Sequence, residues 1–192
     1  RLVGSEMCIR DRSPKFLMDL KTQAPKNITI IDAPMSGATV AANKGTLTFM
    51  VGGEKKLFCY IEPLLELMGT QINHIGNFGS GMMVKVLNNF VAASCVVSVR
   101  HVLHQAQKFD LDIEKLFKTI DTSSGQTWFG TNRASIEWFK ESFELNNTMG
   151  ILTKDVLAYV DAFENETEKD NFVDGQLSES IVKALKNMPI VN

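Results

Sequence analysis

The sequence has 192 residues, of which 44% are hydrophobic, so it can form one medium domain or two small ones with a real core. Its 20 basic and 22 acidic residues give a formal net charge of −2 and are dispersed, which leaves no basic patch for a nucleic acid. Cys8, Cys59 and Cys95 are too scattered for a disulfide framework, as is typical of a reducing compartment. The longest apolar stretch, 90–99, is about half the length of a membrane helix. We therefore expect a soluble intracellular protein that binds neither nucleic acid nor a membrane.

The first twelve residues, RLVGSEMCIRDR, differ in character from the rest of the chain. They have no periodicity and lack the apolar core of a signal peptide. The string resembles translated sequencing-adapter read-through. We therefore expect residues 1–12 to be a non-native leader and the chain to be part of a longer protein.

The next part of the chain alternates predicted helices with predicted strands. Phe16, Leu17 and Leu20 recur at helical spacing, and the run ITIID is typical of a buried strand. The predicted elements are, in chain order, a helix over 13–24, a buried strand over 28–32, a loop over 33–45, a strand over 46–51, a helix over 55–68 that contains Pro63, and a strand over 72–75. Strands separated by helices indicate the edge of an open sheet that helices cover.

From Gly76 onward the pattern is helical. One long helix is expected over 81–109, and because its middle is apolar on most faces it should be the buried spine of its domain. Further helices are expected over 112–120, 135–139, 151–163 and 178–185. We therefore place a domain boundary near Gly76, between a small α/β part and an all-helical part.

Two segments carry groups suited to chemistry, and the first is GNFGSGMMVKVLNN at 76–89. Gly79 and Gly81 stand at the start of the long helix, where a ligand or another backbone can come close. Lys85 and Asn89 are four residues apart and share one helical face. A cation and an amide on an apolar helix are costly to bury without partners. A binding site would supply such partners, but a lysine that extends to the surface beside a capping asparagine also fits the pattern.

The second segment is DAPMSGATVAANKGTLTFMVGG at 32–53. A strand is followed here by Ser36 and Gly37, which offer a hydroxyl and backbone N–H groups at the carboxyl end of the predicted sheet. Ligands bind at that end in open α/β sheets, and such groups suit a carboxylate. A glycine-rich connection between two strands has the same spacing, so the pattern alone leaves both interpretations open.

Together the two segments resemble the 3-hydroxyisobutyrate dehydrogenase family of β-hydroxyacid dehydrogenases, which are relatives of 6-phosphogluconate dehydrogenase. The family's DAPVSGG-type substrate motif and the GTL…VGG that follows it are matched by 32–37 and 45–53. Its GxxGxGxxxKxxNN motif is matched in full by 76–89. The segments SSGQTW at 123–128 and KD at 154–155 are similar to two later family segments.

The resemblance covers residues 28 to about 185. It implies an α/β fold followed by an all-α part: the last portion of a Rossmann-like NAD(P)-binding domain over 13–75, then a helical dehydrogenase domain around one long helix over 76–192. In the intact enzyme the substrate would bind between the two domains.

The resemblance also implies roles for five residues. Lys85 would be catalytic, giving a proton to the carbonyl oxygen during reduction or taking it from the hydroxyl during oxidation, which requires a pKa lowered towards neutrality. Ser36 and Gly37 would bind the substrate carboxylate, and Asn89 would hydrogen-bond the substrate. Lys154 would lie near the nicotinamide end of the cofactor, although a solvated charge pair with its neighbour is the plain alternative.

The implied activity is the reversible oxidation of a 3-hydroxy acid, with hydride transfer to NAD or NADP, in a homo-oligomer of the cytoplasm or mitochondria. The family's GxGxMG loop, which binds the cofactor's pyrophosphate, has no counterpart in this sequence. GNFGSG precedes the catalytic lysine and is not a dinucleotide fingerprint. We therefore expect this chain to be inactive alone.

Smaller departures from the family pattern concern single residues. Ala38 replaces the second glycine of the substrate motif and should narrow the loop. His101 stands where many relatives carry Glu. His101 and His104 are three residues apart on a helix, but without a third ligand nearby no metal site is expected.

Other hypotheses fit parts of the pattern. A reductase of the same superfamily that acts on tartronate, succinic or glyoxylic semialdehyde would carry the same motifs. A non-catalytic helical oligomerisation module would keep the fold but would have no need of Lys85, Asn89 and Ser36. Imine reductases of related fold usually lack the lysine, so Lys85 argues against them.

Overall fold

The computed structural model describes residues 14–164 and 175–191, and the expected leader over 1–12 lies outside them. The described residues form two compact units, the first over 14–88 with 161–164 and the second over 89–160 with 175–191. The division between the units falls inside the long helix, whereas the domain boundary predicted near Gly76 lies at the start of that helix.

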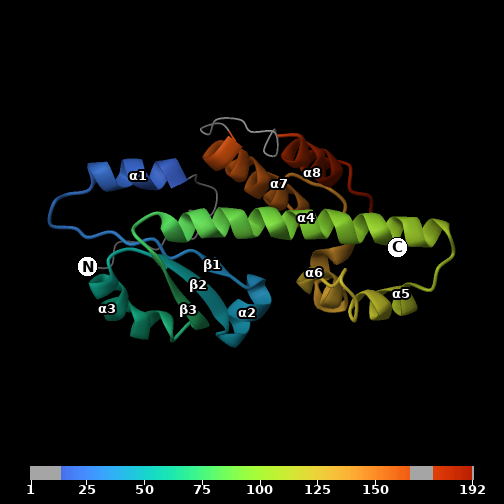
Figure 1. Ribbon diagram of the computed structural model, residues 1–192, viewed down its shortest axis with the longest axis horizontal. Coiled ribbons are helices and arrows are strands. Elements are labelled where there is room, and N and C mark those ends of the chain that lie inside the picture. The colour runs from blue at the N-terminus through green and yellow to red at the C-terminus, as the bar shows by residue number, and fades with distance from the viewer. Residues whose placement is uncertain (1–13, 165–174, 192) are drawn as a thin grey trace. The chain divides into compact units, whose positions relative to one another are not determined.

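The first unit contains a three-stranded sheet in the order β1-β2-β3 (Figure 1). Its strands are β1 (Met35–Ser36), β2 (Leu47–Gly52) and β3 (Gly69–Gly76). β2 is antiparallel to β1 and parallel to β3, and the helix α3 (Lys55–Leu65) provides the crossover that a parallel pair requires. The strands predicted over 46–51 and 72–75 are therefore confirmed, and the second of them is longer than predicted.

The hydrophobic core of the first unit is built from β2 and α3. Phe49 and Val51 are buried on the strand, and Phe58 and Leu65 are buried from the helix. Two further predictions are confirmed here: the helix over 13–24 is α1 (Pro14–Gln23), and the helix over 55–68 is α3 with Pro63 inside it. α3 continues for two residues after that proline and ends at Leu65.

The strand predicted over 28–32 is wrong. Only Asp32 pairs, in an isolated antiparallel bridge with Gly52, and Ile28 is 55% exposed. A β-branched run favours an extended backbone, but a strand also needs a partner. Asp32 lies opposite Gly52, which is the last residue of β2. Because the pairing is antiparallel, residues 28–31 lie beyond the end of β2 and have no residues of that strand to pair with.

The segment predicted as a loop over 33–45 contains two regular elements, β1 and the helix α2 (Ala38–Lys44). α2 is rich in alanine, the strongest helix former, but none of its residues is buried. A helix without a buried face shows no hydrophobic period in the sequence, which is why the pattern did not indicate it. Gly45 ends α2 in the left-handed conformation, with φ of 64°.

The helix α4 (Ser80–Lys108) begins in the first unit and continues through the second, which confirms the long helix predicted over 81–109. Among the described residues after Gly76, the regular elements are helical: α5 (Ile113–Ile120), α6 (Trp128–Thr131), the 3₁₀ helices η2 (Arg133–Ser135) and η3 (Glu137–Lys140), α7 (Thr148–Tyr159), a π-helical turn (Val160–Glu164) and α8 (Gln176–Lys186). The helices predicted over 112–120, 151–163 and 178–185 are confirmed. The one predicted over 135–139 is instead the pair of 3₁₀ helices.

The core of the second unit surrounds the α4 residues that belong to it. Ala93, Val96 and Leu103 are buried on α4, and they pack with buried side chains from the other helices of the unit, among them Phe117 and Leu185. In Figure 1, α7 and α8 run beside α4 in this unit, and α7 and α8 contact each other. A helix in this position is a core helix, which agrees with its expected role as a spine.

Arg100 fixes the end of the chain to α4. Its side chain is 2% exposed, and its guanidinium donates hydrogen bonds to the backbone carbonyls of Phe139, Glu141 and Pro189. Burial lowers the pKa of Arg100 below its ordinary value. These carbonyls therefore take the place of the water that would otherwise solvate the charge, as a buried cation requires.

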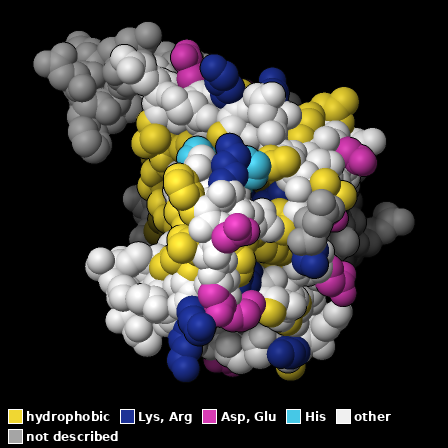
Figure 2. Space-filling view, turned by 90° about the vertical axis from the view of Figure 1, so that its right-hand side faces the viewer, with side chains coloured by type: hydrophobic (Ala, Val, Ile, Leu, Met, Phe, Trp, Pro, Cys, Tyr) yellow, Lys and Arg dark blue, Asp and Glu magenta, His cyan; other side chains and the backbone are white. Residues whose placement is uncertain are grey.

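One stripe of α4 is exposed, contrary to the expectation that the helix is buried nearly all round. Met83, Leu87, Val91 and Val102 are exposed at helical spacing. Figure 2, seen from the right-hand side of Figure 1, shows that hydrophobic side chains lie among charged ones on that face of the molecule. By length and composition alone, α4 could cross a membrane. Core helices pass the same test, and the opposite side of α4 carries the buried residues of the second core.

Candidate active site

α4 carries two of the predicted site residues. Lys85 and Asn89 are both half-buried and stand four residues apart, one turn along the same helix. Lys85 belongs to the first unit, and Asn89 is the first residue of the second. The helix therefore gives the two side chains a common direction, as the motif predicted.

Ser36 and Gly37 lie where β1 ends and α2 begins. Ser36 pairs with Thr48 of β2, so the loop starts from a fixed position at the edge of the sheet. Gly37 has φ of 129°, a backbone conformation that residues with a side chain rarely adopt. A Cβ on Gly37 would also overlap the side chain of Ala41. The backbone therefore requires glycine at position 37, whatever the loop binds.

Asp32 joins this segment to the start of α4. Its carboxyl is buried, with the residue 4% exposed, and its Oδ1 and Oδ2 accept hydrogen bonds from the amides of Gly79, at 2.7 Å, and Met82, at 2.8 Å. Its own backbone exchanges two hydrogen bonds with Gly52, at 3.0 and 2.8 Å. Burial raises the pKa of the Asp32 carboxyl, while the amides of Gly79 and Met82 act in the opposite direction.

Two glycines allow this close junction. A Cβ on Gly81 would overlap the carbonyl oxygen of Met50 and lie 2.8 Å from Oδ2 of Asp32. A Cβ on Gly52 would overlap Oδ1 of Asp32 and lie 2.8 Å from the amide nitrogen of Gly81. The expectation that a glycine at the start of the helix lets another backbone approach is confirmed for Gly81, and the approaching backbone is β2.

The N-terminus of α4 is therefore not a phosphate site. Helix N-termini bind phosphate through amides that have no partner within the helix. Here the amides of Gly79 and Met82 already donate to Asp32, and that of Ser80 donates to the carbonyl of Asn77. This arrangement agrees with the interpretation of GNFGSG as something other than a dinucleotide fingerprint.

The sequence pattern did not indicate that Asp32 caps a helix, and Asp32 was predicted only as the first residue of a substrate motif. Asp32 caps α4, although the amide of Gly79 that donates to its carboxylate is 47 residues later in the chain. Capping patterns are recognisable in a sequence when the side chain and the amide are two or three residues apart. The one available signal was an acidic residue that directly follows an apolar run.

Lys154 lies on α7 in the second unit and is exposed, while its neighbour Asp155 is half-buried. Ser36, Gly37 and Lys85 all belong to the first unit. The described structure thus divides the five predicted site residues into two sets, three in the first unit and two, Asn89 and Lys154, in the second.

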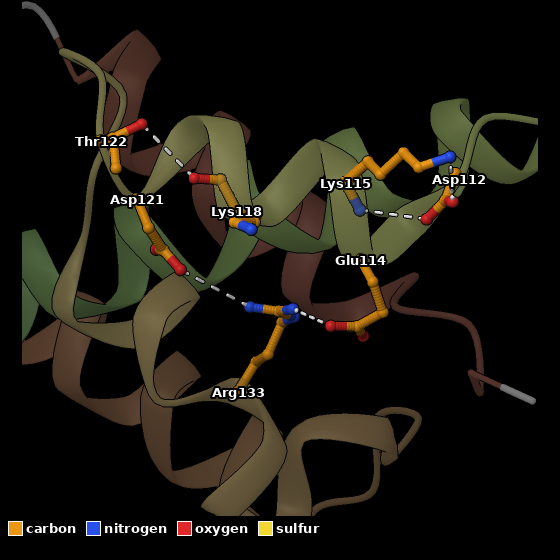
Figure 3. Close-up of a pocket in the computed structure, with 7 residues that line it drawn as sticks. All are labelled: Asp112, Glu114, Lys115, Lys118, Asp121, Thr122 and Arg133. Carbon is orange, nitrogen blue, oxygen red and sulfur yellow. Dashed lines mark hydrogen bonds and ion pairs between the residues drawn. The ribbon is translucent and has the colours of Figure 1, made fainter.

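An open hollow in the second unit is lined by charged residues of α5 and by Arg133, and it contains none of the predicted site residues (Figure 3). Arg133 lies between two carboxylates, 3.0 Å from Glu114 and 4.0 Å from Asp121, so its charge is already neutralised. His101 and His104 are exposed on α4. Over the described ranges, no group of three His, Cys, Asp or Glu side chains is placed to bind a metal ion.

Two family models match the chain. The model described as NAD-binding of NADP-dependent 3-hydroxyisobutyrate dehydrogenase matches residues 79–187, more than half of the chain. The model described as the NAD binding domain of 6-phosphogluconate dehydrogenase matches residues 18–76. The two matches cover the α/β part and the helical part in the expected order.

Individual relatives agree with these models. A probable mitochondrial 3-hydroxyisobutyrate dehydrogenase of Dictyostelium discoideum is 40% identical over 100 residues, which are 52% of this chain and 31% of the relative. A 2-(hydroxymethyl)glutarate dehydrogenase of Eubacterium barkeri is 38% identical over 108 residues, 56% of this chain and 36% of the relative. The chain thus spans about a third of the length of these two relatives.

A solved structure shares the fold. The 3-hydroxyisobutyrate dehydrogenase of Mycobacterium tuberculosis, solved with L-serine, superimposes with a TM-score of 0.74 at 24% identity, covering 93% of this chain and 64% of that one. The α/β sheet followed by helices around one long helix is therefore the arrangement that the sequence predicted. The chain belongs to the 3-hydroxyisobutyrate dehydrogenase family.

Proposed function

We propose that this chain supplies the substrate-binding and proton-transfer residues of an enzyme that reversibly oxidises a 3-hydroxy acid with NAD or NADP. The observation that carries the proposal is the half-buried Lys85 on α4, one turn from Asn89, at the positions of the family's KxxNN motif. The product is the corresponding semialdehyde or keto acid.

Lys85 takes the hydroxyl proton during oxidation and returns it to the carbonyl oxygen during reduction. As a cation it also stabilises negative charge that develops on the substrate oxygen. A bound nicotinamide would supply the acceptor for the hydride that leaves the carbon carrying the hydroxyl.

Ser36 and Gly37 bind the substrate carboxylate through a hydroxyl and backbone amides. The loop is suited to this because β1 fixes it against β2 and Gly37 turns the backbone through a conformation with positive φ. Asn89 hydrogen-bonds the substrate, and Lys154 would lie near the nicotinamide of a bound cofactor.

The described residues fit the substrate side of this reaction better than the pyrophosphate side. The helix N-terminus nearest to Lys85 in the chain is that of α4, and Asp32 already occupies its amides. Because the family's GxGxMG motif has no counterpart in the sequence, we expect this chain by itself to bind NADH and NADPH negligibly. Titration calorimetry of the isolated chain tests this, and micromolar binding would contradict it.

A homo-oligomer inside the cell is the form that we propose for the enzyme. The exposed apolar stripe of α4, which includes Val91 and Val102, supports self-association. Three scattered cysteines and a relative named as mitochondrial support an intracellular location.

The proposal is tested on the enzyme expressed from the complete gene. Formation of NADH and of NADPH is followed with 3-hydroxyisobutyrate, 2-(hydroxymethyl)glutarate and the reduced forms of tartronate, succinic and glyoxylic semialdehydes. Replacing Lys85 by Ala should lower kcat by about 10²- to 10⁴-fold, the usual contribution of a general acid–base group. The control is Lys108→Ala, which changes an exposed lysine in the last turn of the same helix. Near-normal turnover of Lys85→Ala would exclude the mechanism.

The semialdehyde reductase is the second candidate, and it differs in substrate rather than in chemistry. A relative that is named for a different hydroxy acid shows that the family's substrates vary. The semialdehyde reductase would be favoured if kcat/KM for reducing a semialdehyde with NADH or NADPH were higher than kcat/KM for oxidising any of the 3-hydroxy acids tested. A folded protein that turns over none of these substrates would favour the non-catalytic module.

A further inference from the structure

Asp32 makes two sets of contacts that lead to the two halves of the proposed site. Through its backbone it pairs with Gly52, and the same extended segment continues to Ser36, which pairs with Thr48. Through its side chain it accepts hydrogen bonds from the amide of Gly79, directly before α4, and from that of Met82, in the first turn of α4. Ser36 follows Asp32 by four residues, and Lys85 follows Met82 by three.

We propose that Asp32 is a positioning residue, which sets the place of Lys85 relative to the Ser36–Gly37 loop. This inference rests on the proposed function, because it assigns a consequence for turnover to the placement of Lys85. Lys85 lies less than one turn after Met82 on a regular helix, so any shift of the first turn along or around the helix axis moves its side chain as well. Asp32 touches neither substrate nor cofactor in this role.

The packing around Asp32 leaves little freedom for another arrangement. The carboxyl is almost completely buried, and Gly52 and Gly81 lie so close to its two oxygens that neither could carry a Cβ without displacing them. Met50 extends the contact, since its carbonyl oxygen lies against Gly81 and its amide donates to the carbonyl of Pro34, at 2.9 Å. The first turn of α4 is therefore fixed against β2 by backbone contacts on either side of one carboxylate.

The junction also requires two acceptor atoms. Both oxygens of a carboxylate accept, whereas an asparagine in the same place offers one oxygen and one NH₂ group, which is a donor. In Asp32→Asn, the NH₂ group would face either the amide of Gly79 or that of Met82. Two donors in contact repel each other, so the first turn of α4 must shift to relieve them.

The experiment combines Asp32→Asn with Lys85→Ala in a double-mutant cycle on the enzyme from the complete gene. All rates are expressed per folded enzyme, at a temperature well below the Tm of each variant. We expect Asp32→Asn to lower kcat about tenfold or more and to change KM for the hydroxy acid by less than about threefold. In the Lys85→Ala background, the same substitution should change the residual kcat by less than about twofold, because there is no longer a lysine to misplace.

Asp112→Asn is the matched control. Asp112 also caps a helix, since its Oδ1 accepts a hydrogen bond from the amide of Lys115 at 3.0 Å, but it lies on α5 in the second unit and is exposed. It should leave kcat and KM unchanged. If Asp32→Asn does not fold, Asp32→Ser takes its place in the cycle, because a hydroxyl still accepts from one of the two amides.

The outcomes separate the two proposals. Full turnover by Lys85→Ala would exclude the proposed mechanism itself. If Lys85→Ala is impaired but Asp32→Asn has normal kcat, or lowers kcat equally in both backgrounds, only the positioning role is wrong. Failure of both Asp32 variants to fold would also overturn it, since Asp32 would then be needed for the stability of the unit and not for the placement of Lys85.

Discussion

The Oδ1 atom of Asp32 lies 2.7 Å from the amide nitrogen of Gly79, which is 47 residues later in the chain. This hydrogen bond joins the extended segment beside β2 to the first turn of α4. A segment predicted to bind substrate and a helix predicted to carry the catalytic lysine are thus connected by one buried carboxylate. The connection has consequences for stability and for titration that can be measured without substrate.

Gly81→Ala should destabilise the first unit strongly. The added Cβ would overlap the carbonyl oxygen of Met50, which belongs to the backbone of a central strand and cannot rotate away. Overpacking typically costs about 1–3 kcal/mol, and a clash with backbone that cannot move should lie at the upper end of that range. Urea denaturation followed by circular dichroism measures the change. Gly125→Ala is the control, because its Cβ would meet Ile120 at 3.6 Å, an ordinary contact; equal stability of the two variants would contradict the close junction.

Ala38→Gly should stabilise the protein. Ala38 has φ of 54°, and a left-handed conformation costs an alanine about 1–2 kcal/mol. Glycine avoids that cost but loses more chain entropy on folding, so we expect a net gain of about 0.5–1 kcal/mol. Ala42→Gly, in the middle of the same helix α2, should instead cost about 1 kcal/mol. Thermal denaturation of the two variants should therefore shift Tm in opposite directions, and a lower Tm for Ala38→Gly would disprove the strain.

The two capping aspartates should titrate on opposite sides of the ordinary value of 3.8. Burial raises the pKa of Asp32, whereas the hydrogen bond from the amide of Lys115 and the Lys115 side chain lower the pKa of Asp112. Carboxyl NMR titration measures both, with the two Asp→Asn variants for assignment. A lower pKa for Asp32 than for Asp112 would contradict the dominance of burial at Asp32.

The same shifts predict how stability depends on pH. Burial penalises the ionised form of Asp32, and this penalty on folding is absent below its ordinary pKa and grows as pH rises through its raised pKa. The contribution of Asp112 is present above its ordinary pKa and is lost as pH falls through its lowered pKa. Acidification should therefore enlarge the difference in unfolding free energy between wild type and Asp32→Asn, and should reduce that between wild type and Asp112→Asn.

Arg100→Met should cost about 3 kcal/mol or more of unfolding free energy. Methionine fills part of the space but cannot donate to the carbonyls of Phe139, Glu141 and Pro189, and each buried acceptor left unsatisfied costs about 1–3 kcal/mol. Lys115→Met is the control, because its ion pair with Asp112 is exposed and such pairs contribute less than about 1 kcal/mol. Chemical denaturation measures the unfolding free energy of both variants. Equal losses would show that the buried hydrogen bonds of Arg100 contribute no more stability than an exposed ion pair.

Local patterns in the sequence determined most of the helical architecture. α3, α4, α5, α7 and α8 were predicted because each buries one face, and burial of one face imposes a period of about 3.6 residues. α2 buries no face and was predicted as a loop. The strands β2 and β3 were recognised from short apolar runs, but residues 28–31 formed no strand, because strand formation depends on a partner that a local pattern does not contain.

The motif spacing in the sequence determined which residues share an element. Lys85 and Asn89 stand one helical turn apart wherever the helix lies. The cap of α5 is also a contact between residues close in the sequence, because Asp112 accepts from the amide of Lys115, three residues later. Only the tertiary structure showed that Asp32 caps α4, and that Gly52 and Gly81 leave room for its carboxylate. Contacts between residues so distant in the chain arise when separate elements pack, and no period or spacing along the sequence records them.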